Sequence, residues 1–235
     1  MTSMEKQKKG HYHPLTLVER DLEKIFRKIG FSIASGPEVE SEWYNFDALN
    51  VPKDHPARDM QDTFWIKGRP ETVLRTHTSN VQIHYMQEHK PPIRMITMGR
   101  TYRNEATDAT HEAVFHQIEG LMVDRNVTVG NLKATLTYFL SELFGEEVEV
   151  RLRPSFFPFV EPGFEVDAKR KDGGWLEILG AGMVHPNVLS NAGINPNEFQ
   201  GFAFGTGMER LAVLKYGIDD VRVFLSGDLR IIEQF

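Results

Sequence analysis

The chain of 235 residues contains no cysteine. Disulfide bonds and thiolate metal sites are therefore excluded, and the composition fits a reducing compartment. The nine histidines do not recur at the spacing of zinc ligands, so we expect no zinc site either.

Long apolar runs are also missing. No stretch approaches the ~20 consecutive apolar residues that span a bilayer, and the polar N-terminus lacks the apolar core of a secretory signal. We therefore expect a cytoplasmic protein with no membrane partner. Residues 1–13 are predicted to form a polar tail, and residues 14–235 a single domain whose 40% hydrophobic and 26% charged residues are typical of soluble proteins.

A basic excess is lacking too, since the formal net charge is −6. This charge argues against a protein that coats nucleic acid nonspecifically, because affinity for the phosphate backbone depends on lysine and arginine. A local basic patch remains open, and Lys6, Lys8 and Lys9 form one near the N-terminus.

Glycine-rich phosphate loops are absent as well. No Walker A pattern occurs, and Gly205-Thr206-Gly207 lacks the third glycine of a dinucleotide fingerprint. If the protein binds ATP, side chains must hold the phosphates. Arg103 and Arg210 fit that role, because a guanidinium presents a planar fork of donors to phosphate oxygens. Taken alone, the helix favours Arg210 as an ion-pairing residue on an exposed face, and only its combination with the stretch 99–120 favours phosphate binding.

Helical and strand periodicity alternate along the rest of the chain. Apolar spacing predicts helices over Pro14–Ile29, Ser79–His89, Val129–Phe144 and a last one ending at Tyr216. Strands are predicted over Phe31–Ser35, Phe64–Ile66, Val73–Thr76, Glu147–Arg153, Phe164–Lys169, Trp175–Leu179 and Phe199–Phe204, besides two in the stretch 99–121. The polar segment Glu38–Asp62 is predicted to be a long irregular loop. The fold class is therefore α+β, with an antiparallel sheet flanked by helices.

The stretch GRTYRNEATDATHEAVFHQIEG, residues 99–120, concentrates polar side chains between two predicted strands. Strand alternation places Gln117 and Glu119 on one face between the apolar residues Phe115 and Leu121. An unpaired carboxylate would be costly there, so we expect a cationic or hydrogen-bonding partner. A surface hairpin with salt bridges is the alternative interpretation.

This stretch resembles motif 2 of the class II aminoacyl-tRNA synthetases, and its DATHEAVFHQIEG segment is similar to the catalytic α-subunits of bacterial phenylalanyl-tRNA synthetases. GFAFGTGMERLAVLKYG resembles motif 3, and the first helix with its strand ending at Pro37 has the form of motif 1. ALNVPKDHPARDMQDTFWI and GAGMVHPNVL are similar to further strings of these α-subunits. The resemblance runs in order from about His13 to Phe235.

The resemblance implies a class II catalytic domain that activates phenylalanine with ATP and transfers it to tRNA(Phe). It also implies a β-subunit partner within a heterotetramer. In the family an N-terminal helical arm contacts tRNA, and we expect this arm to be absent because the chain begins where the arm would end.

The resemblance also implies roles for single residues. The residues that contact ATP would be Arg103, Glu105, His111 and Arg210. Arg103 and Arg210 would also be catalytic. Glu177 would bind Mg²⁺, a hard cation that needs only one or two protein carboxylates. The phenylalanine contacts would be Trp65, His77, Ser79, Gln117, Glu119, Phe157, Phe159, Val160, Ala203 and Gly205.

Two other functions remain as alternatives. A non-catalytic or regulatory paralogue would have lost the arginines and carboxylates of the motifs, and all of these are present: Arg103, Arg210, Glu119 and Glu177. An adenylating enzyme for another amino acid would have a different pocket, whereas the segments around Phe157, Phe159 and Ala203 match those of the phenylalanine enzymes.

Overall fold

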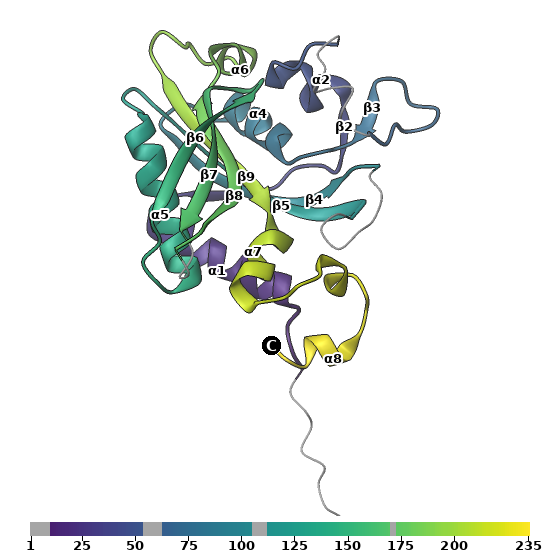
Figure 1. Cartoon of the computed structure of the whole chain (residues 1–235). Coiled ribbons are helices and arrows are strands. Elements are labelled where there is room, and N and C mark those ends of the chain that lie inside the picture. Colours follow the sequence, from purple (N-terminus) through teal and green to yellow (C-terminus); the bar gives the residue numbers. More distant parts are fainter. Residues whose placement is uncertain (1–9, 54–62, 105–111, 170–172) are drawn as a thin grey trace, which may run out of the picture.

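The computed structural model describes residues 10–53, 63–104, 112–169 and 173–235 (Figure 1). Its centre is a seven-stranded sheet in the order β1-β4-β5-β9-β8-β7-β6. β1 runs parallel to β4, and the other neighbouring strands are antiparallel. The strands are β1 (Ser32–Ala34), β4 (Ile93–Tyr102), β5 (Val114–Asp124), β9 (Gln200–Gly207), β8 (Trp175–Val184), β7 (Val160–Lys169) and β6 (Val150–Phe157).

Three helices cover one face of this sheet (Figure 1): α1 (Pro14–Lys28), α5 (Val129–Phe144) and α7 (Met208–Tyr216). They bury a large apolar cluster in which the ring of Phe26 packs against those of Phe31, Phe139 and Phe204. α5 begins with a capping box between Thr128 and Asn131. Such capping satisfies backbone donors that the first helical turn leaves unpaired.

Shorter elements cover the other face (Figure 1): α2 (Glu42–Asn45), the 3₁₀ helix η1 (Asp47–Leu49), α4 (Ser79–Glu88) and α6 (Pro186–Asn191). They bury a second apolar cluster, which includes Ile83 of α4 and Leu121 of β5. A small sheet of β2 (Val39–Ser41) and β3 (Thr72–Leu74) lies apart from the main one. The chain ends in η2 (Val221–Phe224) and α8 (Leu229–Ile232).

The predicted α+β architecture and its main helices are confirmed. The prediction of an irregular loop over Glu38–Asp62 is wrong for the first half of that segment. β2, α2 and η1 lie there, while residues 54–62 fall outside the described part. These elements are three or four residues long, too short for a periodic pattern. β2 also depends on β3, about thirty residues away, for its hydrogen bonds.

The two strands predicted over Phe64–Ile66 and Val73–Thr76, which we expected to pair as a hairpin around residues 67–70, are only partly present. Trp65 forms an isolated bridge with Val73, and the main partner of β3 is β2. The strands β7 to β9 are longer than predicted, whereas β6 begins at Val150, later than the predicted Glu147, and continues to Phe157. β6 meets β7 in a tight turn at Pro158 and Phe159. This turn brings aromatic side chains to the face that carries α4.

No helix of the described segments has the length and apolarity needed to cross a membrane.

The core on the α5 side should respond strongly to cavity formation. Leu136 is fully buried there, so Leu136→Ala should lower the free energy of unfolding by about 3–5 kcal/mol, through lost burial and an unfilled cavity. Leu229→Ala is the matched control, because Leu229 is 69% exposed, and it should change this free energy by less than ~0.5 kcal/mol. Denaturant unfolding followed by circular dichroism makes the comparison. Equal losses in the two variants would contradict the assignment of the core.

Candidate active site

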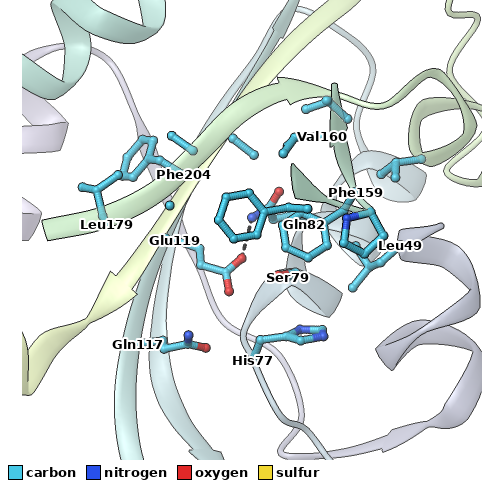
Figure 2. Close-up of a pocket in the computed structure, with 18 of the residues that line it drawn as sticks. Leu49, His77, Ser79, Gln82, Gln117, Glu119, Phe159, Val160, Leu179 and Phe204 are labelled. Atoms are coloured by element: carbon cyan, nitrogen blue, oxygen red, sulfur yellow. Dashed lines mark hydrogen bonds between the residues drawn. The ribbon is translucent and has the colours of Figure 1, made fainter. Parts of the chain in front are cut away.

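A cavity of about 790 Å³ opens on the α4 side of the sheet (Figure 2). Its size falls in the range of small-molecule sites, roughly 300–1,000 Å³. Strands β5, β8 and β9 contribute its floor, the start of α4 one wall, and the β6–β7 turn another. In Figure 2, His77 and Gln117 lie at the lower side of the cavity, whereas Phe159 and Val160 lie at the upper side.

Most residues that the sequence singled out meet at this cavity. Those that line it are His77, Ser79, Arg103, Gln117, Glu119, Phe157, Phe159, Val160, Glu177, Ala203 and Gly205. Arg210 stands beside it, since its Nη2 donates to the backbone oxygen of Glu177 at 3.0 Å. Trp65 is not among the lining residues and is 55% exposed, so its substrate contact stays a prediction. Glu105 and His111 lie outside the described residues.

Glu119 is a buried carboxylate at the polar end of the cavity, only 5% exposed. Its Oε1 accepts a hydrogen bond from the backbone N–H of Thr78 at 3.1 Å. Its Oε2 accepts one from Nε2 of Gln82 at 2.7 Å, the contact dashed in Figure 2. Burial raises the pKa of Glu119, while hydrogen bonds from the start of α4 oppose that rise. The carboxyl group is thus poised to pair with a cation, which would restore the solvation that burial removed.

A glycine on the neighbouring strand makes room for this carboxylate. Gly205 pairs with Glu119 across β5 and β9, and a Cβ at position 205 would stand 2.8 Å from Cγ of Glu119. Real Cβ atoms do not approach so closely, so a larger residue would displace the Glu119 side chain. The glycine that the sequence placed near the substrate therefore acts by its missing side chain.

His77 presents a second acceptor. Its Nε2 lies 3.0 Å from the backbone oxygen of Asn45, and a carbonyl oxygen only accepts, so Nε2 carries the proton. Burial, together with the nearby charges of Arg103 and Arg75, lowers the pKa of His77 to about 3. The ring is therefore neutral at pH 7, and Nδ1 carries a lone pair.

Three acceptors thus gather at one end of the cavity. Nδ1 of His77 and Oε1 of Gln117 are buried and accept no hydrogen bond from any described residue, and the carboxylate of Glu119 lies with them at the cavity wall. Buried polar groups without a partner are uncommon in folded proteins. An ammonium group, with three N–H donors and a positive charge, matches this arrangement.

The opposite end of the cavity is apolar and aromatic. The rings of Phe157 and Phe159 stack with centroids 5.9 Å apart and planes tilted by 20°. A Cβ at Gly180 would stand 3.1 Å from the ring of Phe157, so the missing side chain of this glycine makes room for the ring. Val160 and Ala203 add small apolar surface. Such a wall suits an aromatic ring, since aromatic pairs gain ~0.5–1.5 kcal/mol beyond area burial.

Cationic side chains stand at the rim. Arg103 donates through Nε to the backbone oxygen of Thr76 at 3.1 Å, and its guanidinium lies 5.0 Å from the ring centroid of Phe115. Arg210 reaches the same rim from the first turn of α7. An anionic ligand beside the polar end would meet two guanidinium groups from different elements.

Two carboxylates of the cavity are held by one arginine. Arg153 contacts Glu165 at 2.8 Å and Glu177 at 3.1 Å. No group of three or more possible metal ligands occurs among the described residues. The pair alone matches the donor set of Mg²⁺, which binds one or two carboxylates together with substrate phosphates and water.

Gln82 is the main cavity residue that the sequence reasoning missed. It lies three residues after Ser79, so both side chains share one face of α4. That spacing is the signal that could have found it. Its role depends on the position of α4 against β5, which the local pattern does not encode.

Comparisons with known proteins show which family the chain belongs to. A family model described as tRNA synthetases class II core domain (F) matches residues 1–235. The phenylalanine–tRNA ligase alpha subunit of Aliivibrio fischeri strain MJ11 is 56% identical, over 96% of this chain and 68% of its own length. The protein of the same description from Caldanaerobacter subterraneus is 54% identical, over 97% of this chain and 70% of its own.

A solved structure has the same fold. Pyrrolysyl-tRNA synthetase from Desulfitobacterium hafniense superposes with a TM-score of 0.71, covering 91% of this chain and 74% of its own. At 21% identity this likeness concerns the fold alone.

The low pKa of His77 predicts that the free energy of unfolding decreases as the pH is lowered. Between its usual value of 6.5 and its value of about 3 in the fold, the unfolded chain binds a proton that the folded chain does not. Stability from this residue is therefore full above pH 6.5 and falls with acidification, by up to about 1.4 kcal/mol per pH unit. His77→Gln should show a correspondingly shallower fall in denaturant unfolding between pH 6.5 and 4. The exposed-site control His89→Gln should keep the wild-type slope, and equal slopes in all three proteins would contradict the burial of a neutral ring.

Proposed function

This chain belongs to the class II tRNA synthetases and to the family of phenylalanine–tRNA ligase α subunits, and on that premise we propose that it attaches phenylalanine to tRNA(Phe) with ATP as co-substrate. The observation that carries the proposal is the polarity of the cavity. Three acceptors at one end suit the ammonium group of an amino acid, and stacked aromatic rings at the other suit its side chain.

In the first step the carboxylate of phenylalanine attacks the α-phosphorus of ATP. A carboxylate–phosphorus bond forms, the bond to the bridging oxygen breaks, and pyrophosphate leaves with phenylalanyl-adenylate remaining. Little proton transfer is needed, so positioning and charge neutralisation supply most of the catalysis. Glu119, Gln117 and His77 would hold the ammonium group and thereby aim the carboxylate at the rim.

The two arginines would neutralise the phosphates. Arg103, fixed by its hydrogen bond to Thr76, would stabilise the charge that grows on the α-phosphate. Arg210 would hold the outer phosphates from α7. Glu177, with Glu165 beside it, would hold Mg²⁺, which would neutralise further phosphate charge.

In the second step a ribose hydroxyl at the end of tRNA attacks the acyl carbon, and AMP leaves. The polar end and the aromatic wall would keep the phenylalanyl group in place during this transfer. We further propose that the chain works with a β subunit, since its relatives are named alpha subunits.

The pocket also bears on discrimination against tyrosine. Ala203 offers a methyl group and no hydrogen-bond partner at the apolar end. An apolar pocket of this kind rejects an added hydroxyl by only ~10²-fold. Further selection would then need an editing site elsewhere.

Amino-acid-dependent exchange of pyrophosphate into ATP tests the proposal. Phenylalanine should support exchange best, with and without an added β subunit, and tyrosine should be weaker by roughly 10²-fold. Exchange with an unrelated amino acid alone would favour an adenylating enzyme of another specificity. No exchange with any amino acid in either preparation would favour a non-catalytic paralogue.

Arg103→Ala should lose adenylate formation far more than stability. The lost stabilisation of the α-phosphate should lower the exchange rate by at least ~10²-fold, with a melting temperature close to that of the wild type. Arg100→Ala is the matched control, because Arg100 lies on β4 near Arg103 and points to solvent. Unchanged exchange in Arg103→Ala would remove this residue from the mechanism.

A further inference from the structure

At the junction of β9 and α7, the carboxylate of Glu209 accepts a backbone hydrogen bond from β5 that a strand residue would otherwise accept. The pairing of β5 with β9 ends at Gln117 and Gly207, and α7 begins at the next residue. The backbone N–H of His116, one residue beyond that last pair, donates to both carboxylate oxygens of Glu209, at 3.0 Å each. The carboxylate therefore continues the hydrogen bonding of the sheet past the end of β9.

The same carboxylate receives a third hydrogen bond. Nδ1 of His116 lies 2.8 Å from Oε1 of Glu209, and a carboxylate oxygen accepts, so the ring donates through Nδ1–H. Glu209 is only 7% exposed. A buried carboxylate is costly unless hydrogen bonds compensate its lost hydration, so this contact strongly favours one position of the first turn of α7.

The next residue along α7 is Arg210. Its guanidinium reaches across to the backbone oxygen of Glu177 on β8 at 3.0 Å. Gly207, the N-cap residue, supplies no side-chain cap to the helix. The direction of Arg210 therefore depends on how Glu209 attaches the first turn to β5.

We propose that Glu209 is a positioning residue, which fixes the first turn of α7 on β5 and so aims Arg210 at the outer phosphates of ATP. The inference rests on the phosphate-binding role proposed for Arg210. Neither Glu209 nor His116 lines the cavity, so Glu209 acts through its neighbour rather than on the substrate.

The chain provides a matched control on the same helix. Lys215, in the last turn of α7, contacts Asp21 of α1 at 2.6 Å. This ion pair also anchors α7, but at the end remote from Arg210. Loss of either contact, Glu209 with His116 or Lys215 with Asp21, should weaken the attachment of α7 to the rest of the domain. Only loss of the Glu209 contact should change the direction of the Arg210 side chain.

The test compares exchange kinetics of the full chain. Glu209→Gln keeps the shape of the side chain but replaces one acceptor oxygen by an NH₂ group, which cannot accept a hydrogen bond from the backbone N–H or the ring of His116. It should raise the KM for ATP by roughly tenfold or more, because a small misplacement of a binding group is costly. The KM for phenylalanine should stay within about twofold, since the ammonium site is built by other residues. Lys215→Met should leave both constants within about twofold while lowering the melting temperature.

The variant Arg210→Ala decides whether Glu209 acts through Arg210. In that background Glu209→Gln should change the KM for ATP by less than about twofold, because the group it positions is gone. A full additional rise there, an unchanged KM for ATP in the single variant, or an equal rise in both KM values would overturn the proposal.

Two further measurements keep the test decisive. If Glu209→Gln does not fold, His116→Leu removes only the ring donor and should raise the KM for ATP in the same direction by less; an unchanged KM would overturn the proposal. If the wild type shows no exchange, which contradicts the proposed function, equilibrium titration with ATP replaces the kinetics. Equal ATP affinities of wild type and Glu209→Gln would then contradict the positioning role separately.

Discussion

The buried carboxylate of Glu119 is the constraint on which the arrangement of the site depends. A carboxyl group out of water needs hydrogen-bond partners, and two donors come from the segment where α4 begins. This segment must therefore lie over β5, which brings Ser79 and Gln82 to the cavity. On the other side, β9 must carry a glycine at position 205. One buried carboxyl group thus constrains both the position of α4 and the residue type at position 205 of β9.

The two ends of the cavity come from different parts of the sheet. The acceptors belong to β5 and to the segment before α4, whereas the aromatic wall belongs to the β6–β7 turn. β8 and β9 lie between them and contribute small residues, among them Gly180 and Ala203. Polarity and shape of the cavity are therefore set by separate elements, so a change in the aromatic wall need not disturb the charged end.

The sequence predicts those features that follow from local periodicity. Alternation in β5 places Gln117 and Glu119 on one face, and the structure has both at the cavity. The long helices α1 and α5 are predicted almost to their ends, because each has a clear apolar stripe and a stop signal.

Contacts between distant segments could not be read from the sequence. Gln82 meets Glu119 over 37 residues, and His77 meets Asn45 over 32. The short elements between residues 39 and 49 take their structure from β3 and α4, not from their own pattern. The attachment of Glu209 to His116 spans 93 residues and likewise requires the assembled sheet.

The division of the core into two clusters has a consequence for local opening. The cavity belongs to the cluster beneath α4 and α6, while α1, α5 and α7 pack on the opposite face of the sheet. Regions with fewer buried contacts open at lower free energy than the whole domain. A ligand that fills the cavity stabilises this face by mass action. Amide protons of α4 and η1 would then exchange more slowly once the cavity is filled, while those of α5 would report the stability of the whole domain.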